Sequence, residues 1–151
     1  MKNADTAALK GYDAGKKVSG IKRHIAVDTH GLPHAVAVTT AEVTDRKGAL
    51  QALKRCKRAL SRVQSLLCDS GYVGEPFAQG VCEVLGEHVT VQIAKRSELH
   101  TFQVMPKRWV VERSFAWLEK NRRLCKNCER LLNTSLQFIH LAFLALLIRR
   151  S

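Results

Sequence analysis

Short runs of β-branched residues alternate along the chain with segments in which apolar residues recur at helical spacing. Residues 21–27 and 35–40 are rich in β-branched side chains, and the residues between them favour a turn. This arrangement predicts a β-hairpin, with Asp28 as a turn former. From Thr44, in the N-cap position, the spacing becomes that of a helix with a basic side. That basic side either contacts phosphates or keeps the protein in solution.

A third strand is predicted for residues 63–68, an apolar run that stops at Asp69 and a glycine-rich turn. A carboxylate at the carboxyl end of a strand lies at the edge where open α/β sheets bind ligands. The alternative is that Asp69 is only the first residue of a turn. Residues 76–85 then predict a short helix that ends at Gly86, and residues 89–94 predict a further strand.

Residues 107–123 predict a helix around which the rest of the chain is organised. Its apolar residues Val111, Phe115 and Leu118 lie at i, i+4 and i+7, so one stripe is expected to face a core. A neighbouring polar stripe places acids among guanidinium groups and comprises Arg108, Glu112, Glu119, Arg122 and Arg123. The alternative interpretation of this stripe is a solvated face with intrahelical ion pairs.

The last helix is expected to begin at Thr134, because Gln137 follows three residues later as in a capping box. Its apolar residues predict a core-facing stripe of Leu136, Ile139, Phe143, Leu146 and Leu147. The order of strands and helices predicts an α/β domain with helices on both faces of the sheet. We assign the polar residues 1–20 to a basic arm of loop or extended structure and residues 21–151 to one domain.

Charge narrows the choice of partner. The 151 residues include 25 Lys and Arg against 13 Asp and Glu, a net charge of +12. This charge indicates a polyanionic partner, with nucleic acid first and an anionic membrane surface second. The apolar run 136–148 is too short to span a bilayer of about 30 Å, and residues 1–17 lack the apolar core of a signal peptide. We therefore expect a cytoplasmic protein with no membrane partner.

The chain has five widely spaced cysteines, which are expected to be reduced thiols. Cys125 and Cys128 form a Cys-x-x-Cys pair, which is half of a zinc site only where a second close pair of Cys or His exists. No such pair lies nearby in the sequence, so packing and surface roles are favoured over zinc.

Two acids stand out in this basic chain, Asp69 after a strand and Glu112 on a helix. They are 43 residues apart (112 minus 69). If they converge, their oxygens are suitable ligands for Mg²⁺. Paired divalent ions held in this way activate a nucleophile and stabilise the leaving oxygen in phosphodiester chemistry.

Four ordered segments carry a resemblance to a known family. They are GYDAGKK at residues 11–17, KRHIAVDT at 22–29, CDSGY at 68–72 and RWVVERSFAWL at 108–118. Together they resemble the carboxy-terminal half of bacterial insertion-sequence transposases of the DDE class. The resemblance implies a ribonuclease-H-like mixed sheet flanked by helices and a divalent cofactor, Mg²⁺ or Mn²⁺. It also implies cut-and-join chemistry, in which water and then a DNA 3′-hydroxyl attack a phosphodiester.

The resemblance assigns roles to residues of these segments. Asp69 matches the second catalytic acid of the family and Glu112 the third. Arg108 matches a signature arginine that orients the site or holds a phosphate. Glu119 stands where the family has a lysine, so Lys120 or Arg122 is the candidate replacement.

The first family acid is not matched. In the family it lies on a first strand, upstream of the region where this chain begins, and neither Asp5 nor Asp13 follows an apolar run. We therefore expect a truncated catalytic domain that lacks its first strand and has very low activity alone. An upstream transposase fragment is the expected source of the missing acid, and exposed core makes self-association an expectation.

DNA, as element ends and target, is the partner that this resemblance implies. The basic residues expected to contact it are Lys16, Lys17, Lys22, Arg23, Arg113, Lys120, Arg122 and Arg123. The alternative function is nonspecific nucleic-acid binding without catalysis. A third interpretation is a relic without a selected function.

Overall fold

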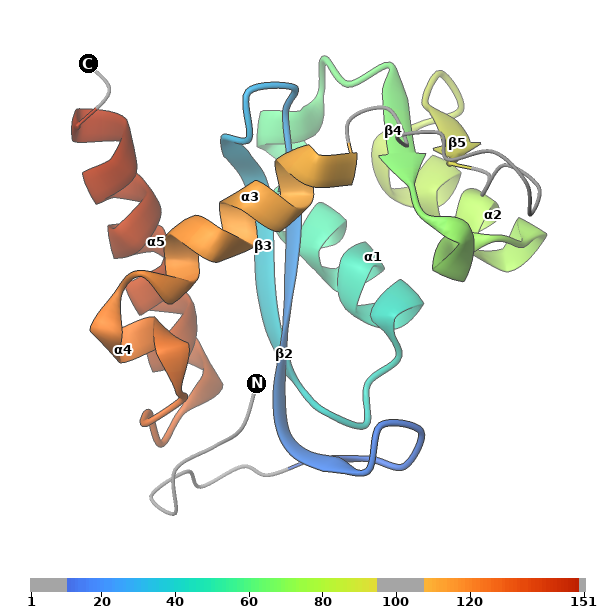
Figure 1. Cartoon of the computed structure of the whole chain (residues 1–151). Coiled ribbons are helices and arrows are strands. Elements are labelled where there is room, and N and C mark those ends of the chain that lie inside the picture. The colour runs from blue at the N-terminus through green and yellow to red at the C-terminus, as the bar shows by residue number, and fades with distance from the viewer. Residues whose placement is uncertain (1–10, 95–107, 150–151) are drawn as a thin grey trace, which may run out of the picture.

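The computed structural model describes residues 11–94 and 108–149, except for the side chain of Arg108. Its strands are β1 (Gly11–Asp13), β2 (Val18–Val27), β3 (Pro33–Thr40), β4 (Ser65–Cys68) and β5 (Thr90–Ile93). Its α-helices are α1 (Asp45–Arg55), α2 (Glu75–Leu85), α3 (Arg108–Glu119), α4 (Arg122–Cys125) and α5 (Leu132–Ile148). Two 3-10 helices are η1 (Lys57–Leu60) and η2 (Ser70–Tyr72). Figure 1 shows β2 and β3 through the middle of the molecule, with α4 and α5 to one side and β4, β5 and α2 to the other.

The predicted β-hairpin is confirmed as β2 and β3, which pair in antiparallel register along residues 21–27 of β2. The turn is closed by Asp28, whose Oδ1 accepts hydrogen bonds from the backbone N–H groups of His30 (2.8 Å) and Leu32 (3.0 Å). Partial burial raises the pKa of this carboxyl, but these bonds and the neighbouring His34 outweigh burial and hold the pKa below its ordinary value. Asp28 is therefore a turn former, as predicted.

Residues 11–20 form a second hairpin, where a loop or extended arm was expected. Strand β1 pairs with residues 18–20 of β2, and Asp13 Oδ1 accepts the backbone N–H groups of Gly15 and Lys16 between them. Lys17 takes a positive φ of 51° to close the turn. The prediction missed this hairpin because three glycines and polar side chains conceal the alternation that marks a strand. Residues 1–10 of the expected arm lie outside the described residues, and the domain boundary at residue 20 stays a prediction.

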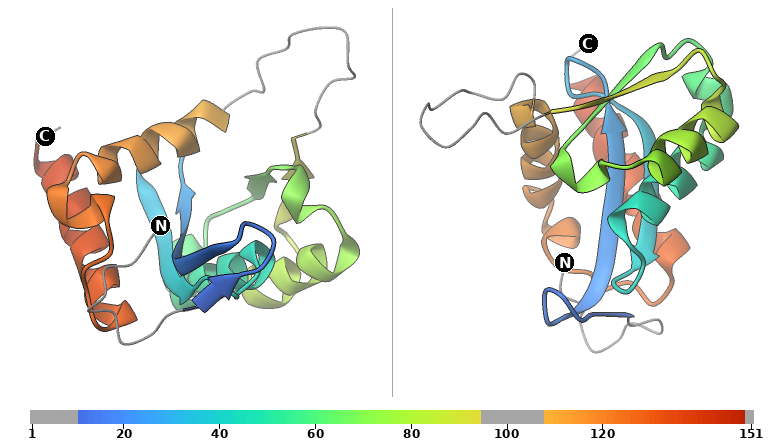
Figure 2. Two further views of the ribbon diagram at one scale, coloured as in Figure 1. Left: turned by 60° about the horizontal axis from the view of Figure 1, so that its bottom comes forward. Right: turned by 90° about the vertical axis from the view of Figure 1, so that its right-hand side faces the viewer.

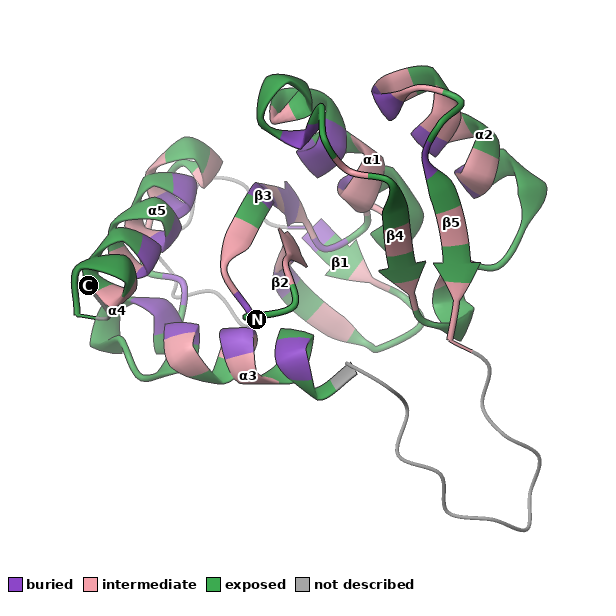
Figure 3. Ribbon diagram, turned by 90° about the horizontal axis from the view of Figure 1, so that it is seen from above, coloured by how far each residue is buried: buried purple, intermediate pink, exposed green. Residues whose placement is uncertain are grey.

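Helices cover both faces of β3, as the order of elements predicted. Ala35 and Ala37 point to one side, where they are buried against α1 and α2 in the first core. Val36, between them, points to the other side and is buried against α3, α4 and α5 in the second core. This alternation follows from the period-2 geometry of a strand. Figure 3 shows the buried stripes of α1 and α5 turned inward toward β3 from opposite sides.

The strands form two separate sheets, where one mixed sheet was expected. Strands β1, β2 and β3 form one sheet, and β4 pairs in parallel only with β5 within the described residues. Helix α1 packs on β2, β3 and α2, and α2 packs on β5, so these two helices join the sheets from one side. Figure 2 shows the β4–β5 pair standing apart from β2 and β3. The mixed α/β class is confirmed, whereas the ribonuclease-H-like arrangement stays a prediction.

The predicted ends of α1 and α2 are confirmed by their geometry. Thr44 is the N-cap of α1, and its hydroxyl accepts the backbone N–H of Lys47 at 3.4 Å. Helix α2 ends before Gly86, whose φ of +112° is a conformation that favours glycine.

The predicted helix 107–123 is shorter than expected, and Arg122 and Arg123 belong to the separate helix α4. Asn121 ends α3 by donating from Nδ2 to the carbonyls of Trp117 (3.0 Å) and Leu118 (3.3 Å). These bonds satisfy carbonyl groups that the helix leaves open. The expected single polar face from residue 108 to residue 123 is therefore wrong, because the chain changes direction at Asn121.

Helix α5 begins two residues before the predicted start, and the capping-box prediction is wrong. Its N-cap is Leu131, without a side-chain cap, and Thr134 lies inside the helix. The start is held instead by Ser135, whose Oγ donates to Oδ1 of the buried Asn127 at 2.6 Å. The core stripe is confirmed at Leu136, Ile139 and Phe143, Leu146 is half-buried, and Leu147 is exposed. Among the described helices, none has the length and apolar character needed to cross a bilayer.

Candidate functional site

Asp69 lies directly after β4 and caps η2. Its Oδ1 accepts a hydrogen bond of 2.9 Å from the backbone N–H of Gly71. The residue is exposed, and its Oδ2 makes no hydrogen bond within the described part of the chain. Asp69 is therefore a turn residue that still has one carboxylate oxygen available for a cation.

Arg46, in the first turn of α1, holds the same turn from its other side. Its Nε donates to the carbonyl of Gly71 at 3.0 Å. The ring of Tyr72 packs on Phe77 with 5.0 Å between centroids, and burial, with smaller effects of Asp45 and Asp69, raises the pKa of Tyr72 to about 12. From the sequence, Arg46 is expected only on the basic side of a helix, because no local pattern predicts a contact 25 residues away.

Two of the three positions in the buried stripe of α3 lie one residue before the predicted positions. Val110, Ser114 and Leu118 are buried at 3%, 0% and 1% exposure, whereas Val111 is 37% exposed and Phe115 is half-buried. Ser114 is a small polar residue at the centre of this stripe, so the pattern of apolar residues does not mark it as buried. The predicted stripe was therefore placed on Val111 and Phe115 instead. Ser114 indicates instead that backbone from elsewhere approaches the helix closely.

That backbone is the turn between β2 and β3. The Oγ of Ser114 lies 2.9 Å from the carbonyl of Gly31 and 2.9 Å from that of Val110, so its single proton is donated to one or the other. Gly31 has a φ of +85°, and a Cβ added to it would lie 3.0 Å from this Oγ and 3.2 Å from the ring of Trp117. Both the φ and the close approach therefore favour glycine at this position.

Arg113 also binds α3 to the turn between β2 and β3, closer to the surface than Ser114. Its guanidinium carbon lies 4.4 Å from the ring centroid of Trp109 and 4.9 Å from that of Trp117, one helical turn on either side. Its Nη2 donates to the carbonyl of His30 at 2.9 Å. These contacts, with those of Ser114, fix the rotation of α3 about its own axis.

This rotation places Glu112 on the outer face of α3. Glu112 precedes Ser114 by two residues, which is about 200° around the helix, and it is exposed. Helix α3 packs on β2, α4 and α5, and η2 packs on α1. Glu112 lies in the first half of α3. In Figures 1 and 3 the amino-terminal end of α3 is the end nearer to the β4–β5 pair, and Asp69 follows β4 in the sequence. Arg108 begins α3, and its side chain lies outside the described part.

The metal-ligand set around these acids is incomplete in the described residues. No group of three or more His, Cys, Asp or Glu side chains there is arranged to hold a metal ion. Burial, with a smaller effect of Asp69, raises the pKa of the neighbouring Cys68 thiol to about 11, so Cys68 stays protonated and is a poor ligand. Cys125 and Cys128 are exposed and are not in a disulfide bond. Asp69 and Glu112 carry carboxylate oxygens, the kind of ligand that a divalent ion prefers, and a site for paired ions requires further oxygen ligands.

Several of the basic residues expected to contact DNA make structural contacts. Lys22 Nζ lies 2.9 Å from Asp13 Oδ2 and 3.6 Å from Asp45 Oδ1, and it donates to the carbonyl of Val43 at 3.0 Å. Arg23 donates from Nη2 to the carbonyl of Leu124, and burial lowers its pKa. These two side chains join β2 to neighbouring elements.

The other predicted DNA contacts are divided between structural and exposed positions. Arg123 pairs with Glu129 at 2.6 Å and lies 4.7 Å from the ring centroid of Phe138. The remaining members of the predicted set besides Arg113 are exposed, and they are Lys16, Lys17, Lys120 and Arg122. Contact of any of these residues with DNA stays a prediction.

Comparisons with known proteins agree on one family. Residues 1–148 match the family model described as the Transposase DDE domain. The chain is 34% identical over 134 residues to a Burkholderia cepacia protein described as a "putative transposase for insertion sequence element IS402". The alignment covers 84% of this chain and 60% of that relative, so the chain spans well under two thirds of the relative's length. No solved structure matches significantly.

Proposed function

Because the chain belongs to the DDE family of transposases, we propose that it supplies two of three catalytic carboxylates for cleavage and strand transfer of DNA. The two are Asp69 and Glu112. The observation that carries the proposal is that each acid is exposed on an anchored element. The Asp69 turn is held by Arg46, and α3 is clamped to the hairpin turn through Arg113 and Ser114. Fixed orientation of this kind is what a catalytic group requires.

The third carboxylate is proposed to arrive on an added strand. Residues 21–27 of β2 pair only with β3, and β4 pairs only with β5, within residues 11–94 and 108–149. Each strand therefore has an edge that can accept another strand. An upstream transposase fragment on such an edge would complete a ribonuclease-H-like sheet and the acid triad. Asp13 is a poor substitute because its carboxylate is committed to Lys22 and to its own turn.

The family uses divalent metal ions, and we propose Mg²⁺ or Mn²⁺, which Asp69 and Glu112 would help to hold. Arg108 would orient the site or bind a phosphate, and Lys120 or Arg122 would take the place of the family lysine. DNA in the bacterial cytoplasm is the proposed partner. Because two carboxylates do not complete the site, the chain alone should have very low activity.

The test is metal-dependent nicking and strand transfer on labelled duplex DNA, with the chain alone and with the segment encoded directly upstream. We expect activity only with both parts, lost in Asp69→Asn and in Glu112→Gln. Activity of the chain alone that disappears in Asp69→Asn would show a complete site and overturn the proposed need for a third carboxylate on an added strand. Joint activity that survives both substitutions would overturn the site assignment.

A second candidate is nonspecific nucleic-acid binding without catalysis. It is favoured by the net charge of +12 together with the absence of a three-ligand metal group among the described residues. Salt-sensitive binding that Mg²⁺ does not change, without activity in the joint assay, is the result that this candidate predicts.

A further inference from the structure

A dense cluster of basic residues within the described part of the chain lies away from the predicted DNA contacts. The segment from α1 through η1 carries seven basic residues and one acid between positions 44 and 62, and all seven are exposed. They are Arg46, Lys47, Lys54, Arg55, Lys57, Arg58 and Arg62. The single acid, Asp45, is already paired with Lys22.

None of these seven side chains forms an ion pair with another described residue, in contrast to Lys22 and Arg123. Their charge is therefore not neutralised by a neighbouring acid within the described part. Unpaired cations concentrated on one element attract a polyanion and repel one another when no polyanion is bound.

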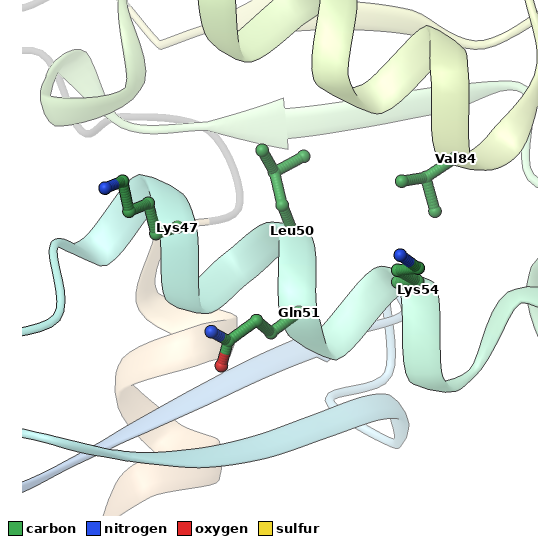
Figure 4. A pocket seen from close by; sticks show the side chains of 5 residues that line it. All are labelled: Lys47, Leu50, Gln51, Lys54 and Val84. Carbon is green, nitrogen blue, oxygen red and sulfur yellow. The ribbon is translucent and has the colours of Figure 1, made fainter.

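Part of this surface is hollowed. A hollow of about 260 Å³ between α1 and α2 is lined by Lys47, Leu50, Gln51, Lys54 and Val84. Figure 4 shows Lys47 and Lys54 near its two ends, with Leu50 between them and Val84 opposite. The acidic residues of α2 do not line the hollow.

The two lysines are seven residues apart, so they lie on one side of α1 and about 10.5 Å apart along its axis. Neither side chain has a partner among the described residues. Gln51 adds an amide that donates and accepts hydrogen bonds, and Leu50 and Val84 add apolar surface. Two ammonium groups, an amide and an apolar floor are complementary to the phosphates and sugars of a nucleic-acid backbone.

We propose that this α1–α2 hollow binds the sugar–phosphate backbone of duplex DNA, with Lys47 and Lys54 as the phosphate contacts. The proposal rests on the proposed function, which makes DNA the partner, and adds a contact surface outside the candidate active site. Arg46, in the same helix, joins the two regions because it also holds the Asp69 turn. DNA on this surface would therefore run past the turn that carries Asp69.

The test compares the salt dependence of duplex DNA binding by the wild-type chain and by Lys47→Gln/Lys54→Gln. Loss of two phosphate contacts should make the slope of log K against log salt less steep by about 1.8. This change corresponds to an affinity about 60-fold lower than that of the wild type at 0.1 M salt. The matched control is Lys126→Gln/Arg130→Gln, which removes the same charge from exposed positions before α5 and should leave the slope unchanged. Unchanged circular dichroism spectra and unfolding midpoints exclude misfolding, since Lys and Gln have similar helix propensities.

An unchanged slope in Lys47→Gln/Lys54→Gln, with salt-sensitive binding by the wild type, overturns this inference and leaves the proposed function standing. Equal losses in both double variants also overturn it, because the effect is then one of net charge. A wild-type chain that binds no DNA overturns the inference and the proposed function together. Binding to phosphatidylserine vesicles but not to DNA assigns the surface to lipid and overturns the inference.

Discussion

Replacing Gly48 with alanine tests how α1 is seated on the β-hairpin. Gly48 is buried inside α1, and a Cβ at this position would lie 2.1 Å from His24 Nε2 and 2.2 Å from His24 Cε1. His24 is itself buried, at 7% exposure, and its Nε2 lies 2.9 Å from Thr39 Oγ1. The ring therefore has little room to retreat, and moving it breaks a buried hydrogen bond.

Two opposing effects decide whether Gly48→Ala raises or lowers the free energy of unfolding. Alanine is favoured over glycine in a helix interior by about 1 kcal/mol. Overpacking a core typically costs about 1–3 kcal/mol, and leaving a buried polar group without its partner costs about 1–3 kcal/mol more. We therefore expect Gly48→Ala to lower the free energy of unfolding by at least about 1 kcal/mol.

The assay is urea unfolding followed by circular dichroism, with Gly80→Ala in α2 as the matched control. A Cβ at Gly80 would lie 2.8 Å from Leu50 Cδ1, the tip of a flexible and half-buried side chain that can shift. Gly80→Ala should thus be neutral or more stable by up to about 1 kcal/mol. A Gly48→Ala chain as stable as the wild type, with an unchanged urea slope, would refute the packing of α1 described above.

Two further predictions concern the groups around the hairpin. Burial is the main cause that lowers the pKa of His24 from its ordinary 6.5, so below that pH the unfolded chain binds more protons than the native chain. The free energy of unfolding should fall as pH decreases from about 7.5 to 5.5, and less steeply in His24→Gln; identical profiles would contradict this. Arg113→Lys loses the planar contact with both tryptophans and the bond to His30, and should destabilise the chain by about 1–2 kcal/mol. Because the chain has two tryptophans and both lie in this contact, the maximum of tryptophan fluorescence emission should shift to longer wavelength. An unchanged emission spectrum would contradict the stacking of Arg113 between the two rings.

Features set by neighbouring residues could be predicted from the sequence. Thr44 and Gly86 mark helix ends because capping depends on one turn of chain, and Asp28 marks its turn for the same reason. The order of strands and helices predicted helices on both faces of the sheet, and the packing on either side of β3 confirms it.

Features set by distant contacts could not be predicted. The helix break at Asn121 depends on which carbonyls the folded chain leaves open, and the inner position of Ser114 depends on a turn 83 residues away. For the site, the sequence singled out Asp69 and Glu112 first by their places after a strand and on a helix, and the resemblance then gave them roles. The support from Arg46 has no local signature. The side-chain contacts of the fold show which cations are committed to structural roles, and charge counting alone does not distinguish Lys22 from Lys54.

The 83-residue separation between Gly31 and Ser114 also has a kinetic consequence. Closing a loop of that length costs about 4 kcal/mol of chain entropy by the logarithmic rule, so this contact forms slowly compared with a local turn. The hairpin turn closes within a few residues and can form early during synthesis. Helix α3 is made later, so we expect the hairpin to form before α3 packs on it. The order of synthesis would then match the order of assembly, and the earlier hairpin would set the orientation of Glu112.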